Sequence, residues 1–424
     1  MGSEEMTMPP FGLELREKEF CMRKGSMFLN HGSFGMVPRR IKDVQKSYID
    51  KMDDHPDDWF RRNNLGKWKA GRDAIAMFVN ANPEDVVLVQ NATTGINTIL
   101  KSLNLKEGDG ILATDNTYPA IQFTCEHVKT SINGAKYHMM GVKYPIENED
   151  DVVDQYRQFL SSNPNVRLAV IDHITSSTAV VMPIKKIIQV CREHNVMSMI
   201  DGAHAPGQVP IDMKDLDPDF YTGNLHKWAY TPRGCALLYV RKEHHAWVRP
   251  LVTSWYYLKE FTMEFFMQGT RDDCAYVTVP DALQFYDDLG GMTAITGHNS
   301  SLLDILTERM VTEWGTDKLP IPRDMEAPCL RMVRLPKMDG YDITTAEAYR
   351  LMDDLFYEHD IQVQLFCVLD SLFVRLSANV YNYADEYSVF INLIRDVSQN
   401  KRPMCLERIS AKSSENSDMP FSAK

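Results

Sequence analysis

The chain has 424 residues, of which 44% are hydrophobic and 25% are charged, and its formal net charge is −12 at pH 7. This length allows two domains with a large buried core, and the composition is ordinary for a globular protein. An acidic chain has no basic excess with which to displace counterions, so we expect no nucleic-acid partner. The eight cysteines lie without C-x-x-C spacing, so neither a metal site nor a disulfide framework is predicted.

The sequence contains no recognisable targeting signal. Its first residues are partly acidic and lack the apolar core of a secretory signal. Met6 stands where a myristoylation motif needs Ser or Thr. No apolar segment is long enough to span a bilayer. We therefore expect a cytoplasmic protein with no membrane partner.

The N-terminal part is predicted to be irregular at first and then helical. Residues 1–25 are polar and predict an arm that orders only against the rest of the protein. Phe28 and Leu29 predict a short strand, and Asn30-His-Gly-Ser-Phe-Gly35 predicts a glycine loop after it. Residues 39–80 have helical periodicity.

Beyond this region, predicted strands and helices alternate, with connections short enough for βαβ units. The strands are predicted over 84–89, 110–113, 136–142, 166–172, 197–200 and 220–221, and helices over 91–100, 152–161 and 184–194. The alternation predicts an α/β fold with a mostly parallel sheet between helices. We expect a large domain over 26–289, a smaller C-terminal α/β domain over 290–398 with a helix at 299–314 and strands at 361–366 and 371–376, and a disordered tail over 399–424.

Two of these strands end beside residues that suit catalysis. The apolar run before Asp201 predicts a buried strand, and ligands of open α/β sheets bind at the carboxyl ends of strands. The next run leads to His226 and Lys227. Taken singly, such an acid is commonly a turn residue and such a lysine a surface residue. Together they suit pyridoxal 5'-phosphate, whose aldehyde condenses with a lysine and whose ring nitrogen pairs with a carboxylate.

A third candidate is the start of the helix that follows Asn91. Exposed N–H groups and the helix dipole favour a phosphate at a helix N-terminus, and the hydroxyls of Thr93 and Thr94 add donors. Alone, the pattern is also a common helix cap.

Seven motifs, in this order along nearly the whole chain, resemble the class V aminotransferase family of fold-type I pyridoxal-phosphate enzymes. The resemblance is greatest to its branch of isopenicillin-N-epimerase-like proteins, cysteine desulfhydrases and hercynylcysteine-sulfoxide lyases. The motifs are Phe-Leu-Asn-His-Gly-Ser-Phe-Gly (28–35), Asn-Ala-Thr-Thr-Gly-Ile-Asn (91–97), Asp-His-Ile-Thr-Ser-Ser-Thr-Ala (172–179), Asp-Gly-Ala-His (201–204), Asn-Leu-His-Lys-Trp (224–228), Gln-Gly-Thr-Arg-Asp (268–272) and Val-Arg-Leu-Ser (374–377).

The resemblance implies a mostly parallel seven-stranded sheet sandwiched by helices, and it implies roles for individual residues. Lys227 would carry the cofactor and act as base, Asp201 would pair with the ring nitrogen, and His204 would bind the phenolic oxygen. The further cofactor contacts implied are Ala92, Thr93, Thr94, Tyr118, Ser176, Asn224, His226 and Thr270. Among them, Tyr118 would stack on the ring, and Ser176 stands where many relatives have Asn.

The substrate is expected to be a small-molecule amino acid. Arg375 matches the family arginine that binds the α-carboxylate, and Asn30, His31 and Gly32 lie in a loop that is near the substrate in the family. The segment with Thr270 resembles one that reaches the phosphate of a neighbouring subunit, which implies a homodimer with shared active sites.

The reaction is the most open point. We favour a carbon–sulfur β-lyase acting on cysteine or a cysteine S-conjugate or sulfoxide. The alternatives are an amino-acid epimerase or racemase, an aminotransferase and a non-catalytic scaffold with the same fold. A persulfide-forming desulfurase needs a nucleophilic cysteine on a mobile loop, and the nearest candidate, Cys367, lies in an apolar strand.

Overall fold

The computed structural model describes residues 8–404, which group into two compact units. The larger unit consists of Phe34–Ala294 and Pro320–Ala327. The smaller unit consists of the segment that ends at Ser33, Ile295–Leu319 and the chain from Pro328 onward. None of the helices in the described range is both long and apolar enough to cross a membrane.

A seven-stranded sheet forms the centre of the larger unit, with the strand order β2-β8-β7-β6-β5-β3-β4. Strand β8 is antiparallel to both of its neighbours, and the remaining pairs are parallel. The predicted seven-stranded, mostly parallel sheet is therefore confirmed. Its strands are β2 (Val86–Val89), β3 (Gly110–Thr114), β4 (Lys136–Met140), β5 (Val166–Asp172), β6 (Met197–Asp201), β7 (Phe220–Asn224) and β8 (Ala236–Val240).

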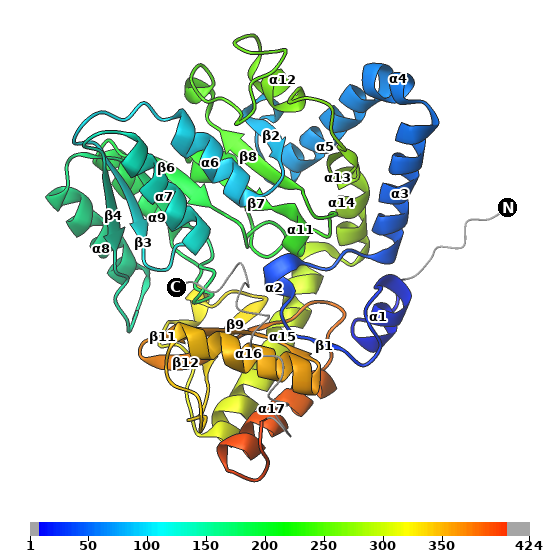
Figure 1. The fold of residues 1–424 in the computed structure, drawn as a ribbon, viewed down its shortest axis with the longest axis vertical. Coiled ribbons are helices and arrows are strands. Elements are labelled where there is room, and N and C mark those ends of the chain that lie inside the picture. Colours follow the sequence, from blue (N-terminus) through cyan, green and yellow to red (C-terminus); the bar gives the residue numbers. More distant parts are fainter. Residues whose placement is uncertain (1–7, 405–424) are drawn as a thin grey trace, which may run out of the picture. The chain divides into compact units, whose positions relative to one another are not determined.

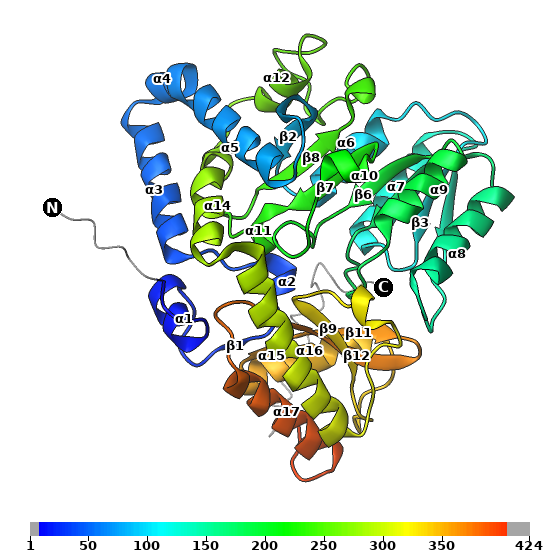
Figure 2. The same ribbon diagram turned by 180° about the vertical axis from the view of Figure 1, so that it is seen from behind.

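Helices cover both faces of this sheet, which is why its central strands are apolar without alternation. Helices α6 and α7 lie on the face toward the viewer in Figure 1, and α9 and α10 lie on the face toward the viewer in Figure 2. Ile96, Ile99 and Leu100 of α6 pack in one buried cluster with Val87 and Leu238 of the sheet. These helices are α6 (Ala92–Ser102), α7 (Pro119–Ser131), α8 (Glu149–Ser162), α9 (Ile184–Glu193) and α10 (Met213–Leu216).

The helix-rich region predicted over residues 39–80 is also observed. It includes a π-helical segment, η1, in which Trp59 is buried against Cys274 and Val277 while Arg61 and Arg62 are exposed. The remaining helices of the larger unit are α3 (Arg39–Asp54), α4 (Pro56–Asp58), η1 (Trp59–Asn63), α5 (Asn64–Phe78), η2 (Pro83–Asp85), α11 (Leu225–Trp228), η3 (Lys242–His244), α12 (Phe261–Phe266), α13 (Cys274–Val277), α14 (Val279–Asp288) and η4 (Arg323–Met325).

The smaller unit contains an antiparallel sheet of order β11-β12-β9 and a parallel pair of β1 with β10. Helices α15 and α17 lie side by side, and Trp314 Nε1 donates to the Ile391 carbonyl 3.1 Å away. The elements are α1 (Leu13–Glu19), β1 (Met27–Phe28), α2 (His31–Phe34), α15 (Gly291–Trp314), β9 (Leu330–Arg334), α16 (Thr345–His359), β10 (Ile361–Gln362), β11 (Gln364–Val368), β12 (Ser371–Ser377) and α17 (Ala384–Ser398).

The N-terminal segment differs from its predicted description. Because Met27 and Phe28 pair with β10, residues 26–33 group with the smaller unit and not with the large domain. The predicted arm contains helix α1, which buries Leu15, and the predicted glycine loop contains the helical turn α2. Most of the predicted tail, from residue 405 onward, lies outside the described residues.

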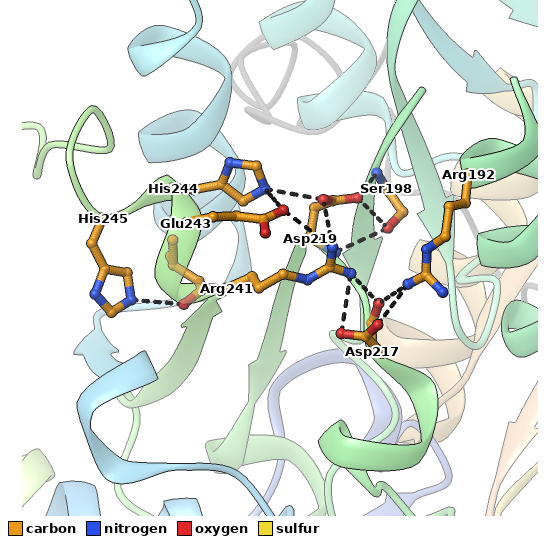
Figure 3. A network of polar contacts seen from close by, with 9 residues as sticks. Arg192, Ser198, Asp217, Asp219, Arg241, Glu243, His244 and His245 are labelled. Carbon is orange, nitrogen blue, oxygen red and sulfur yellow. Dashed lines mark hydrogen bonds and ion pairs between the residues drawn. The ribbon is translucent and has the colours of Figure 1, made fainter. Parts of the chain in front are cut away.

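A polar network stabilises the edge of the large sheet where β6 and β7 begin (Figure 3). One oxygen of the Asp219 carboxylate accepts from the backbone N–H and the hydroxyl of Ser198, at 2.8 and 3.0 Å. The other lies 3.0 Å from His244 Nε2 and 3.3 Å from a guanidinium nitrogen of Arg241. These contacts tie three adjacent strands together at the end opposite to Asp201 and Asn224, the residues with which β6 and β7 end.

Candidate active site

The three residues predicted to be catalytic come together at the carboxyl ends of two adjacent strands. Asp201 is the last residue of β6, is buried, and accepts a hydrogen bond from the Ala203 N–H at 3.0 Å. Lys227 lies in the short helix α11 directly after β7, and its Nζ is 3.0 Å from Nε2 of His204. Burial raises the pKa of Asp201, an effect that the Ala203 N–H and the Lys227 charge partly offset.

Helix α11 can pack closely against the segment that contains Gly35, because this residue has no side chain. Gly35 has φ +67, and a Cβ there would lie 1.8 Å from the His226 carbonyl oxygen. Arg233 holds the same segment, since its guanidinium donates to the carbonyls of Phe34 at 3.1 Å and Gly35 at 2.8 Å. Of the two glycines in the predicted loop, Gly35 has the positive φ and the close backbone approach, whereas Gly32 lies in the helical turn α2.

The residues predicted to bind the cofactor phosphate lie at the start of α6. Asn91 caps the helix, because its Oδ1 accepts from the Thr94 N–H at 2.8 Å. Asn224, at the end of β7, accepts from the Ala92 N–H at 2.9 Å and so connects the start of α6 to the strand that leads to Lys227. The first turn of α6, which consists of Ala92, Thr93 and Thr94, therefore presents its positive dipole end at the same sheet edge.

His226 is held as a neutral imidazole. Its Nδ1 lies 3.1 Å from the Cys235 carbonyl, which can only accept, so Nδ1 carries the hydrogen and Nε2 is an acceptor. Burial, with a smaller effect of the Lys227 charge, lowers the pKa of His226 to about 4. A phosphate contact at Nε2 would therefore require this nitrogen to gain a proton.

The other predicted cofactor residues lie on loops of the larger unit. Tyr118 stands at the N-cap position of α7, is 39% exposed, and has its pKa raised by burial and by the charge of Asp201. Ser176 is half-buried in the loop after β5. Thr270 is exposed in the segment after α12. Tyr118 is thus within electrostatic reach of Asp201.

The four predicted substrate-binding residues come together in the smaller unit. Arg375 of β12 is 2% exposed, and its guanidinium lies 3.3 Å from Asn30 Oδ1 and 3.2 Å from Ser33 Oγ. The Gly32 N–H donates to Ser377 Oγ at 3.1 Å. Burial lowers the pKa of Arg375 to about 10, so the guanidinium remains charged at neutral pH, as an anion-binding group requires.

His31 is completely buried and holds this cluster together. Asn379 Nδ2 is 2.9 Å from its Nε2, so Nδ1 carries the hydrogen and donates to the Tyr381 hydroxyl at 2.8 Å. Sequence reasoning missed Ser33, Asn379 and Tyr381 as members of the cluster. The signal was present, since all three lie inside or directly after the motifs at 28–35 and 374–377.

The larger unit offers the amine of Lys227, the buried carboxylate of Asp201, which a cationic partner would stabilise, and the N-terminus of α6. It also offers the partly exposed aromatic ring of Tyr118. This donor set fits pyridoxal phosphate. An α/β sheet that presents the set at its carboxyl edge defines the chain as a protein with a fold-type I cofactor site.

Comparison with known proteins agrees with this class. The model of the class-V aminotransferase family matches residues 62–345, and the chain belongs to this family. The expected fold and the family's cofactor, pyridoxal 5'-phosphate, are thereby confirmed.

Three curated relatives match most of the chain. A probable chloroplastic L-cysteine desulfhydrase of Arabidopsis thaliana is 31% identical over 85% of this chain and 80% of its own length. Hercynylcysteine sulfoxide lyase of Schizosaccharomyces pombe is 24% identical over 91% and 97%. Isopenicillin N epimerase of Amycolatopsis lactamdurans is 28% identical over 88% and 95%.

Solved structures share the fold. The apo structure of a cysteine desulfurase from Thermococcus onnurineus superposes with a TM-score of 0.75 at 18% identity, covering 93% of this chain and all of that one.

Proposed function

We propose that the protein is a pyridoxal-phosphate-dependent carbon–sulfur β-lyase that acts on cysteine or on a cysteine S-conjugate or sulfoxide. The observation that carries the proposal is the 3.0 Å contact between Lys227 Nζ and His204 Nε2, close to the strand end that presents Asp201. The names of two relatives, a desulfhydrase and a sulfoxide lyase, support the choice of reaction.

In this reaction the Cα–H and Cβ–S bonds of the substrate break. When bound at this site, pyridoxal phosphate would supply an electron-accepting ring. Lys227 takes the Cα proton as general base, and His204 holds its amine in place. Asp201 would pair with the ring nitrogen and keep it protonated, and Arg375 would bind the α-carboxylate. The sulfur leaves with a proton, and hydrolysis of the remaining three-carbon unit yields pyruvate and ammonia.

Persulfide chemistry is disfavoured by the state of Cys367. This residue is half-buried on β11, and burial, with the charge of Asp370, raises the pKa of its thiol. A thiol with a raised pKa is a poor nucleophile at neutral pH.

Epimerisation is the second candidate, because one relative is named an epimerase. It needs a second proton donor on the substrate face opposite Lys227. A silent scaffold and an aminotransferase are less favoured alternatives. A non-catalytic scaffold would not require Lys227, Asp201 and Arg375 together, and all three are present.

The deciding experiment is incubation of the holoenzyme with cysteine and several S-conjugates in deuterated water, with the Lys227→Ala variant as the background control. Pyruvate released together with sulfide or the matching thiol supports the lyase. Deuterium at Cα with inversion and no pyruvate contradicts it and supports the epimerase. A keto acid formed together with amination of the cofactor would instead identify an aminotransferase.

We also propose that the enzyme is a cytoplasmic homodimer with shared active sites. Thr270 is exposed beside a cavity of about 140 Å³ that is lined by Thr94, Gln268 and Arg271, among other residues. Apolar side chains of the preceding loop are also exposed, and exposed apolar groups of this kind are typical of interaction sites. They are Leu251, Val252, Trp255 and Leu258.

A further inference from the structure

Two buried carboxyl groups stand side by side behind the cofactor site. Asp172 ends β5 and Asp201 ends β6, and the two are paired residues of adjacent parallel strands. Paired residues of this kind point to the same face of the sheet, and the strands are about 5 Å apart. Each residue is only 4% exposed, so water screens neither carboxyl group.

The two carboxyl groups have unequal partners. Asp201 accepts from the Ala203 N–H and is stabilised by the charge of Lys227. Asp172 accepts from the Thr117 hydroxyl at 3.0 Å and from its own backbone N–H. Within residues 8–404, Asp172 forms no ion pair. A negative charge is therefore stabilised better on Asp201 than on Asp172.

Two buried carboxyl groups this close together cannot both be ionised without a large free-energy cost, because their negative charges repel. We propose that Asp172 is a positioning residue that holds the proton of this carboxyl pair, so that Asp201 alone carries the negative charge that meets the ring nitrogen of the cofactor. Burial and the charge of Asp201 both raise the pKa of Asp172 well above its usual range, in agreement with this assignment.

Among the described residues that face the pair, none places a positive charge beside Asp172. Tyr156 of α8 brings no positive charge, because it is a phenol whose pKa is raised chiefly by burial. His173 is neutral, because burial lowers its pKa to about 4, and its Nδ1 lies 2.8 Å from the hydroxyl of Tyr221. On the Asp201 side, Tyr118 and Tyr221 feel the charge of Asp201, and Lys227 is the cation.

The test compares Asp172→Asn, which is neutral at every pH, with the wild type and with Asp201→Asn. We expect Asp172→Asn to keep the dissociation constant of pyridoxal phosphate, and the pH midpoint of the bound cofactor's visible absorbance, close to wild type, within about threefold and half a pH unit. We expect Asp201→Asn to weaken cofactor binding at least tenfold. A tenfold loss in Asp172→Asn, or a shift of its absorbance midpoint by a full pH unit, would overturn the assignment.

A second readout uses the apoprotein and needs no cofactor. A carboxyl group whose folded-state pKa is raised stabilises the fold at low pH, and this contribution is lost as the pH rises toward that pKa. The unfolding temperature of Asp172→Asn should therefore rise relative to wild type between pH 5 and pH 8. A constant difference across this range would show an ionised Asp172 and contradict the proposal.

If Asp172→Asn does not fold, Thr117→Val serves in its place, because it removes a donor and leaves the carboxyl group intact. A protonated Asp172 tolerates this loss, and cofactor affinity changes less than about threefold. An ionised Asp172 would lose a buried charge-assisted hydrogen bond, and affinity would fall about tenfold or more.

Discussion

Two histidines flank the catalytic lysine, and their hydrogen bonds give them different tasks. His204 faces the Lys227 amine directly, so it fixes where that amine stands. His226 is turned toward the Cys235 carbonyl and leaves Nε2 as an acceptor. The histidine next to Lys227 in sequence is therefore held by the Cys235 carbonyl, while the histidine that contacts the Lys227 amine is more distant in sequence.

Replacing Lys227 by alanine tests the centre of the site. The variant should lose turnover and the covalent trapping of the cofactor by borohydride, because no other amine in the described site is placed to form the attachment. The exposed Lys185, which pairs with Asp215, provides the matched control. Lys185→Ala should trap the cofactor as wild type does. If trapping survives in Lys227→Ala, Lys227 is not the residue that attaches the cofactor.

His226 gives the apoprotein an acid-sensitive stability. The unfolded chain binds a proton near the ordinary pKa of 6.5, whereas the folded residue resists protonation until about pH 4. Stability is therefore full above pH 6.5 and decreases as the pH falls toward 4, by about 2–3 kcal/mol for this group. His226→Asn should weaken the dependence of the unfolding temperature on pH, measured from pH 7.5 to 4.5. The same change at the exposed His127 should leave the pH dependence as in wild type. An equal pH dependence in the two variants would contradict the prediction.

At the scale of single residues, the sequence located the polar residues that lie at the ends of buried strands. Asp201 and Lys227 could be predicted because each follows an apolar run that stops abruptly. The sequence indicated that Gly35 permits a close backbone approach, but it could not show that the His226 backbone lies opposite Gly35 or that Asp201 lies opposite Asp172. That information is contained in the packing and pairing of segments and not in local sequence.

Among the elements, helix α6 shows how a cap serves a binding site. Asn91→Ala should cost about 1 kcal/mol of stability through the lost cap. It should also weaken pyridoxal-phosphate binding several-fold, because the first turn that presents the N–H groups loosens. Asn82 is a matched control, since its side chain caps η2 by accepting from the Glu84 N–H at 3.2 Å.

Asn82→Ala should lower the unfolding temperature without changing the cofactor's dissociation constant, measured by absorbance titration. Equal losses of cofactor affinity in both variants would mean that the effect is one of general stability.

Predicted elements were most accurate where burial and periodicity coincide. Strand β5 and the start of α9 match the prediction, and β12 matches it within one residue. The strand predicted over 361–366 is divided between β10, which pairs with β1, and β11, which pairs with β12. Strand β7 extends beyond its apolar run to Asn224, because neighbouring strands bury Thr222 and Gly223 as well. Helix α15 begins at Gly291, before the predicted start, in a stretch whose two glycines, Gly291 and Gly297, obscured the helical pattern.

For the whole molecule, the two units carry different predicted groups of site residues. The cofactor set belongs to the larger unit and the substrate set to the smaller one. Arg375 lies in the predicted C-terminal domain, whereas Asn30, His31 and Gly32 come from the segment predicted to belong to the large domain and group with the smaller unit. Their grouping depends on the pairing of β1 with a distant strand.

Shared active sites can be tested by complementation between two inactive variants. Lys227→Ala removes the base, and Thr270→Asp places a negative charge where the partner's phosphate is proposed to lie. Each homodimer should be inactive, whereas a refolded mixture should recover about a quarter of wild-type activity, because half of the random dimers carry one intact site. A mixture that stays inactive while sedimenting as a dimer would contradict sharing.

The pairing of β1 with β10 has a consequence for how the chain matures. Met27 and Phe28 leave the ribosome early, but the strand that receives them is made only after the whole seven-stranded sheet. Loop closure over such a separation is slow, and the early segment has no strand partner until then. Met27 and Phe28 are therefore among the last residues to find their strand partners, so Asn30 and His31 can take their places only after β10 has been made.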